Sequence, residues 1–207
     1  MHRQVTAAIA VGTAVETLLR LIAGAAARLC ASDFAAITLL TGDGDSLELA
    51  GVFGTRAVEP GLRVPVSGSL NGLVIKSGRS VRSSDALRDP RPVVREIPRR
   101  SGARGILMVP LRNPHGPFGT LAVAKRVPWR FTDRDAALLT QLADSASIAI
   151  QNAQLRARIR GDRRKRGARA AVTDGPPTHA EGRAPGRALD HLPPREREIL
   201  DLLVAGG

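Results

Sequence analysis

The sequence has one cysteine, four phenylalanines, one tryptophan, no tyrosine and no long apolar run. Cys30 has no partner for an internal disulfide, which fits the reducing cytoplasm. No apolar stretch reaches the roughly 18 residues that a membrane span needs. The first fifteen residues resemble a short signal peptide, but charged residues then interrupt a helical pattern. We therefore predict a cytoplasmic protein without membrane contact.

The groupings of residues that common catalytic sites require are also missing. The sequence shows no paired carboxylates, no Ser-His-Asp arrangement and no cluster of metal ligands. A nucleophilic thiol needs a lowered pKa and normally a resolving partner, whereas Cys30 stands alone at the end of an apolar helix. We interpret Cys30 as a small buried hydrophobe and predict neither enzyme activity nor a metal site.

The net charge of +12 is spread unevenly. Residues 1–155 carry 19 basic and 12 acidic groups, whereas residues 156–169 carry 8 basic and 1 acidic group. This basic run has two interpretations of equal weight. It is a solvated linker or helix end whose cations suit the helix dipole, or it contacts DNA phosphates. It has no aromatic residue for base stacking, so binding by the run alone would be salt-sensitive and blind to sequence.

Residues 103–127 predict a β-hairpin at the centre of a sheet. Both alternating sets of its first strand are apolar, so the strand must be covered on both faces. Asn113, Pro114, His115 and Gly116 form the expected turn. Because proline lacks the N–H that a strand ladder uses, we expect a bulge or an unpaired position at Pro110.

The remaining patterns predict further helices and strands. Ser69 is the expected N-cap of a short helix over residues 70–76, and Gly78 is expected to end it. The other expected elements are a helix over residues 13–30, strands over 33–40, 47–53, 62–66 and 81–84, and one helical turn within the proline-rich residues 89–100.

A long helix is expected over residues 132–159, ending at Gly161. Thr132 is its N-cap, and Asp135 stands at the capping-box position. Such a helix is about 42 Å long, so its far end should leave the domain or meet another copy. We predict a homodimer through the helices over residues 13–30 and 132–159.

The order of these elements resembles a GAF domain. The resemblance is carried by ILMVPLR (residues 106–112), FGTLAVAKR (118–126), the helix that opens RFTDRDAALL (from Arg130) and SGSLNGLVIKSGRSV (67–81). It implies an α/β (α+β) fold over residues 11–160: an antiparallel sheet of five or six strands with the two long helices on one face. Residues 69–100 would cover the other face and form a ligand pocket. Its expected lining residues are Phe53, Val66, Leu70, Val74, Arg82, Val94, Ile97, Leu107 and Leu121.

The sequence departs from the motifs of two ligand classes that GAF domains bind. Haem-binding relatives place an axial histidine in the proline-rich segment, but residues 96–105 contain none, so we predict no cofactor. Cyclic-nucleotide relatives carry a motif of which Lys125, Phe131 and Asp135 remain here, whereas Ala124 and Ala136 depart from it. We favour a structural role in which Lys125 pairs with Asp135.

A second resemblance concerns the last residues. Residues 161–188 are basic, then rich in Pro, Gly and Ala, and predict a flexible, disordered linker. The segment LPPREREILDLLVAGG (residues 192–207), in a region that begins at residue 189, resembles the opening of a LuxR-type helix-turn-helix that stops after its first helix. The candidate nucleic-acid contacts are Arg163, Arg164, Lys165, Arg166 and Arg195.

Together these features favour a sensory module of a bacterial transcription regulator, with an unknown small ligand and output to DNA if the helix-turn-helix is completed. One alternative is a GAF-type enzyme such as a free methionine sulfoxide reductase, and Cys30 is the residue that suggests it. The other is a truncated regulator that pairs with relatives or binds nucleic acid weakly through residues 156–169.

Overall fold

The computed structural model describes residues 2–91 and 95–173. Met1–Arg166 form one compact unit, and a second begins at Gly167. Among the described residues, no helix is both long and apolar enough to cross a membrane.

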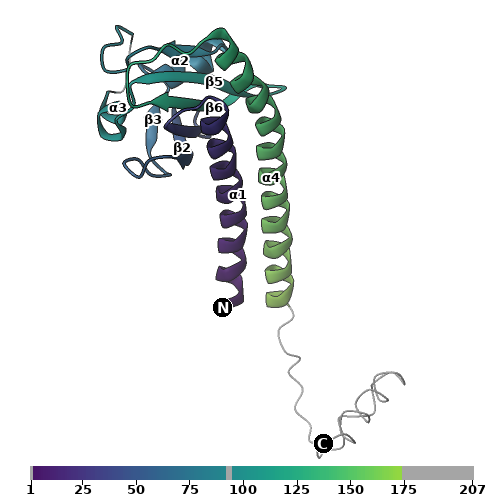
Figure 1. Ribbon diagram of the computed structural model, residues 1–207. Helices are drawn as coiled ribbons and strands as arrows, with labels where there is room; N and C mark the ends of the chain where they lie inside the picture. The colour runs from purple at the N-terminus through teal and green to yellow at the C-terminus, as the bar shows by residue number, and fades with distance from the viewer. Residues whose placement is uncertain (1, 92–94, 174–207) are drawn as a thin grey trace, which may run out of the picture. The chain divides into compact units, whose positions relative to one another are not determined.

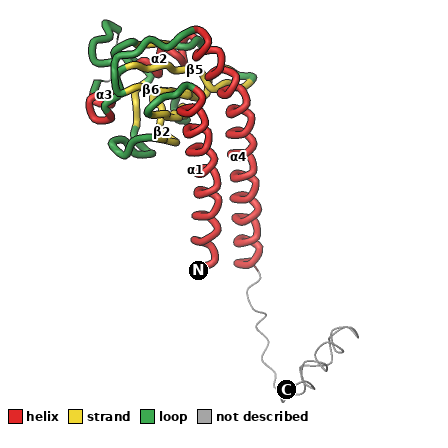
Figure 2. Tube along the Cα trace, in the orientation of Figure 1, coloured by secondary structure: helices red, strands yellow, loops and turns green. Residues whose placement is uncertain are grey.

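A six-stranded antiparallel sheet forms the centre of the first unit, in the order β3-β2-β1-β6-β5-β4. The expected antiparallel sheet is therefore confirmed, and the hairpin of residues 103–127 lies inside it (Figure 2). The strands are β1 (Phe34–Leu40), β2 (Ser46–Phe53), β3 (Arg63–Pro65), β4 (Val81–Ser83), β5 (Gly105–Asn113) and β6 (Gly116–Lys125).

Helices cover both faces of this sheet (Figure 1). On one face, α1 (His2–Leu29) and the start of α4 (Asp133–Thr173) bury an apolar cluster that includes Leu107, Leu121 and Leu139. On the other face, α2 (Leu70–Ser77) packs on a second cluster with Ile106 and Met108, and α3 (Glu96–Ser101) lies in the segment before β5. The alternation along β5 thus sends neighbouring side chains into two different cores, as the doubly apolar pattern predicts.

The predicted helix caps are present. Ser69 Oγ accepts a hydrogen bond from the Gly72 amide at 3.0 Å, and Gly78 ends α2 in the left-handed conformation. At the start of α4, the Asp135 carboxylate accepts from the Thr132 amide at 2.7 Å, and the Asp135 amide donates to Thr132 Oγ1 at 3.2 Å. These local bonds begin both helices where the sequence places them.

Of the two expectations at Pro110, the unpaired position is confirmed on the β4 side, whereas the bulge lies just beyond this residue. Pro110 pairs in register with Thr120, and the irregularity lies between Leu111 and Arg112. The Ala124 carbonyl accepts from Asp33 on the β1 side, so by strand alternation the main chain of Thr120 also points toward β1. Pro110 therefore needs no bond to β6. Its nitrogen faces the β4 side, where β4 begins only opposite Met108 and does not reach Pro110.

The expected helix end is wrong. α4 continues through Gly161 to Thr173, so it includes residues 161–173, which the sequence assigned to the linker. The rest of that linker and the region from residue 189 lie outside the described residues. The domain boundaries themselves stay predictions.

Candidate functional site

An apolar cavity lies on the sheet face opposite α1 and α4. Its floor consists of alternate residues of the three central strands, and its cover includes Ile97 and Ser101 of α3. The floor residues are Phe34 and Ala36 of β1, Ile106 and Met108 of β5, and Ala122 and Ala124 of β6. Three of these six are alanines, and their short side chains leave the space that larger residues would fill.

The cavity has two adjoining parts, of about 100 and 60 Å³. Ile97, Ala103, Ile106 and Met108 line both parts. These volumes are well below the roughly 300–1,000 Å³ of sites for drug-sized ligands. The cavity as it stands suits a small apolar molecule, and a larger ligand requires movement of α3.

A polar group lies at one end of the cavity. Asn71 of α2 lines the smaller part, and its Oδ1 accepts from Thr120 Oγ1 at 2.8 Å. Thr38 Oγ1 lies 2.8 Å from the same hydroxyl, and both threonines are buried. This chain of hydrogen bonds fixes Asn71 beside the cavity, where an otherwise apolar ligand would find one amide partner.

Two ion pairs hold the segment that covers the cavity. Asp85, just after β4, accepts from Arg104 Nε at 2.7 Å and Nη2 at 2.6 Å. Asp89 accepts from Arg91 Nε at 2.9 Å and Nη2 at 2.7 Å. Hydrogen bonds from the arginine hold the pKa of each carboxyl below its usual value. Arg91 Nη2 also donates to the Arg82 carbonyl of β4, which fixes the Asp89–Arg91 pair to that strand. The Asp85–Arg104 pair joins the β4 end of the cover to its β5 end.

The structure divides the predicted pocket residues among several places. Ile97 and Leu70 line the cavity. Leu107 and Leu121 do not, because they point to the opposite face and are fully buried under α1 and α4. Sequence alternation shows that both faces of β5 are apolar but does not say which face holds the cavity.

The other predicted pocket residues have different settings. Val74 is buried in the apolar cluster beneath α2, and Val66 is half-buried with its carbonyl against Gly72. Arg82 pairs with Asp133 at 2.7 Å. Phe53 lines a separate groove on the α1 side, and Val94 lies outside the described residues.

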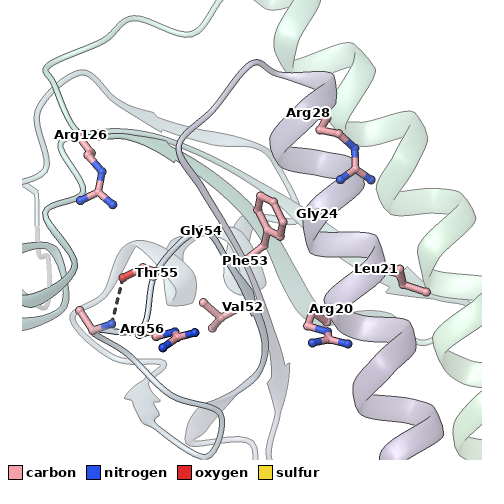
Figure 3. A pocket seen from close by; sticks show the side chains of 11 residues that line it. Arg20, Leu21, Gly24, Arg28, Val52, Phe53, Gly54, Thr55, Arg56 and Arg126 are labelled. Atoms are coloured by element: carbon pink, nitrogen blue, oxygen red, sulfur yellow. Dashed lines mark hydrogen bonds between the residues drawn. The ribbon is translucent and has the colours of Figure 1, made fainter.

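That second hollow is an open groove of about 760 Å³ between α1 and the loop after β2 (Figure 3). Phe53 stands near its middle, and its ring lies against Gly24. Four exposed arginines line it: Arg20 and Arg28 from α1, Arg56 from the β2–β3 loop, and Arg126 from the loop after β6. Sequence reasoning missed this groove, because its arginines are far apart in the chain and none belongs to a basic run.

Cys30 is 7% exposed and belongs to the apolar cluster beneath α1 and α4. Burial, and after it the charge of Asp135, raise the pKa of its thiol to about 11. The thiol is therefore protonated at neutral pH, which is unfavourable for a nucleophile. The interpretation of Cys30 as a buried hydrophobe is confirmed.

The predicted pair of Lys125 and Asp135 is wrong. The Lys125 ammonium lies 5.0 Å from the centre of the Trp129 ring, and the Asp135 carboxylate is occupied with Thr132 in the capping box. Of the predicted nucleic-acid contacts, residues 163–166 lie on α4, and Arg195 lies outside the described residues.

A family model described as GAF domain matches residues 12–151 of the chain. The GAF domain of a phosphoenolpyruvate-protein phosphotransferase from Coxiella burnetii has a TM-score of 0.62 at 20% identity, covering 69% of this chain and 85% of that chain. The second GAF domain of DevS from Mycobacterium smegmatis has a TM-score of 0.57 at 25% identity, with coverages of 69% and 97%.

An enzyme shares the same fold. The free methionine-R-sulfoxide reductase from Neisseria meningitidis, solved with its substrate, has a TM-score of 0.57 at 20% identity, covering 70% of this chain and 86% of that chain. A comparison with curated proteins finds no match. The fold is therefore shared by GAF domains of larger proteins and by an enzyme, and it does not by itself identify the function.

Proposed function

Because the chain belongs to the GAF domain family, a family of signal-sensing modules, we propose that it is the non-enzymatic sensory part of a transcription regulator. It binds a small, mainly apolar ligand in the cavity beneath α3. The raised pKa and burial of Cys30 support a binding role over thiol chemistry.

The observation that carries the proposal is that the same three strands, β1, β5 and β6, form the cavity floor on one face and pack against the long helices on the other. Ile106 and Met108 of β5 line the cavity, whereas Leu107 and Val109 pack in the cluster with α1 and α4. Packed cores do not deform freely, so a ligand that shifts β5 must also change the helix packing. A ligand that prefers one helix arrangement therefore shifts the population toward it.

We further propose that the output passes through a homodimer. Ile148, Leu155 and Ile159 of α4 are 66%, 57% and 46% exposed. Their spacing of seven and then four residues places them on one face of the helix, as in helices that pack on a partner helix. A second copy would cover this stripe.

Output to DNA is supported by the sequence of the last part of the chain. The basic run of residues 156–169 begins at the end of the exposed stripe on α4, and residues 192–207 resemble the first helix of a LuxR-type helix-turn-helix. A titration with duplex DNA across salt concentrations tests this part, with the cations at 163–166 replaced by glutamine as the variant. If affinity at low salt is the same for both proteins, these residues do not contact DNA.

The cavity is tested by filling it. Ala122→Leu extends a floor residue into the cavity, and Ala137→Leu, on the exposed face of α4, is the matched control. Xenon and a panel of small aromatic molecules serve as probes, since dry apolar cavities bind both. We expect probes to raise the melting temperature of wild type and control but not of Ala122→Leu. Equal responses of all three proteins would place the binding elsewhere.

The dimer is tested by charge. Leu155→Glu places a carboxylate in the exposed stripe, and Val127→Glu makes the same kind of change at a loop residue that is 55% exposed. Light scattering should show dimers for wild type and Val127→Glu and monomers for Leu155→Glu. Monomeric wild type at high concentration would refute the dimer proposal.

A further inference from the structure

The groove of Figure 3 has a charge pattern that the apolar cavity does not explain. Four arginines from three separate segments line it: Arg20 and Arg28 from α1, Arg56 and Arg126 from loops. No carboxylate pairs with any of their guanidinium groups within the described part of the chain. Positive charges that line one groove without a carboxylate in direct contact repel each other, and a bound anion removes that repulsion.

Local structure positions these arginines. The Arg126 guanidinium lies 4.2 Å from the centre of the Phe34 ring. The backbone amide of Arg126 donates to the Asp33 carboxylate at 2.7 Å. Thr55 Oγ1 accepts from the Ala57 amide at 3.1 Å and closes a turn with Arg56 in its middle. The aromatic stack therefore positions Arg126, and the turn positions Arg56.

The α1 side of the groove is set by spacing. Arg20, Gly24 and Arg28 recur every four residues, so they follow one side of the helix, and the two arginines are about 12 Å apart along its axis. Gly24 between them has no side chain, which allows the Phe53 ring to lie against the helix. A single phosphate or sulfate cannot span this distance, whereas a chain of phosphates can reach several of the arginines.

The neighbouring part of the groove limits the length of the anion. Beyond Arg20 and Arg56 the hollow continues and is lined by Glu16 and Glu59. A long polyanion such as nucleic acid would meet these carboxylates and be repelled. The charge pattern thus favours a short anion that ends within the arginines.

We propose that the groove binds a small polyphosphate compound of the nucleoside di- or triphosphate class. The phosphates contact Arg28 and Arg126, and also Arg20 and Arg56. A guanidinium group suits this role because it can donate two parallel hydrogen bonds to phosphate oxygens. The flat ring of the ligand stacks on Phe53, which is 37% exposed. This site goes beyond the proposed function, and it shares only Val52 and Thr55 with the apolar cavity.

Calorimetric titration of the full chain with ATP, tripolyphosphate, inorganic phosphate and adenosine tests the site. We expect ATP to bind most tightly and inorganic phosphate and adenosine to bind at least about tenfold more weakly, because each lacks one half of the contacts. ATP binding no tighter than that of inorganic phosphate would overturn the proposal. Tripolyphosphate binding equal to that of ATP would overturn the stacking on Phe53.

Three variants locate the binding. Arg28→Gln and Arg126→Gln should each weaken ATP about tenfold, the usual loss for one charged hydrogen bond. Arg79→Gln removes the same charge from an exposed position outside the groove and should leave binding unchanged. Equal losses for all three would mean a general effect of net charge and would refute the site.

The outcome is independent of the proposed function. Ala122→Leu fills the apolar cavity and should leave ATP affinity unchanged, so either proposal can fail alone. Circular dichroism of each variant confirms that its fold is intact before its affinity is compared.

Discussion

Arg104 binds Asp85 through two hydrogen bonds of 2.7 and 2.6 Å, across nineteen residues of chain. The Arg104 carbonyl also accepts from the Ala86 amide at 2.8 Å. The pair joins the end of β4 to the start of β5 and so closes the segment that carries α3 over the cavity. A change at this one contact should therefore alter the stability of the segment that covers the cavity.

Asp85→Asn should loosen that cover. The amide keeps the size of the side chain but loses the charge that binds Arg104, so local opening of α3 becomes easier. Hydrogen exchange of residues 96–101 should become faster and the melting temperature lower. The control is Asp144→Asn, an exposed carboxylate of α4, for which neither measurement should change. Unchanged exchange in α3 of the Asp85 variant would show that the pair does not hold the cover.

Stability should fall in acid through Asp89. Hydrogen bonds from Arg91 hold the pKa of this carboxyl well below its ordinary 3.8, so the folded protein favours the charged form. The contribution is complete above pH 3.8 and is lost as pH falls through the lower folded pKa. Asp89→Asn should reduce stability at neutral pH and show a weaker further loss below pH 3.8 in denaturant titrations. Parallel wild-type and variant curves in acid would contradict this assignment.

Gly72→Ala should destabilise the protein, although alanine is the better helix former. A Cβ at residue 72 would lie 1.6 Å from the Val66 carbonyl oxygen, so α2 must move away from the loop before it. Overpacking of this kind costs about 1–3 kcal/mol. At Gly42 an added Cβ meets nothing within 4 Å, and Gly42→Ala should change the unfolding free energy by less than about 0.5 kcal/mol. Urea unfolding of both variants measures the difference.

Cys30 should resist alkylation while the protein is folded. Its thiol pKa is raised to about 11, so at pH 8 only about one thiol in a thousand is ionised, and burial blocks the reagent as well. Mass spectrometry after iodoacetamide treatment should find labelling only in urea. Stability linked to this thiol is complete below pH 9.0 and is lost as pH rises toward 11. Rapid labelling of the native chain would revive a thiol mechanism.

Gly161→Ala decides between the two ends proposed for the long helix. In the structure Gly161 lies inside α4, is exposed and does not have a positive φ. Alanine should then stabilise the helix by about 0.5–1 kcal/mol and increase the helical circular dichroism signal. A glycine that ended the helix in the left-handed conformation would instead make the alanine variant less stable. A loss of helix signal would thus restore the end that the sequence predicts.

The difference at Gly161 shows how local signals compete. A glycine followed by many charges is a common helix end, whereas Arg, Lys and Ala after it are good helix formers. Caps formed by side chains within three residues, at Ser69 and Thr132, were by contrast predictable, because each bond is contained in the local sequence. The predicted pair of Lys125 with Asp135 is wrong because the Lys125 ammonium lies over the ring of Trp129, four residues later in the chain.

The sequence by itself determined the hairpins, the starts of α2 and α4 and the burial of both faces of β5, because these follow from alternation, turn residues and caps a few positions apart. Only the tertiary structure decided that Ile106 faces the cavity while Leu107 faces the helices, since the register with β4 and β6 fixes that choice. It also decided which arginines meet, because Arg20, Arg56 and Arg126 come together only when α1 packs across β2. Contacts between segments so far apart depend on the closed fold, and no short pattern records them.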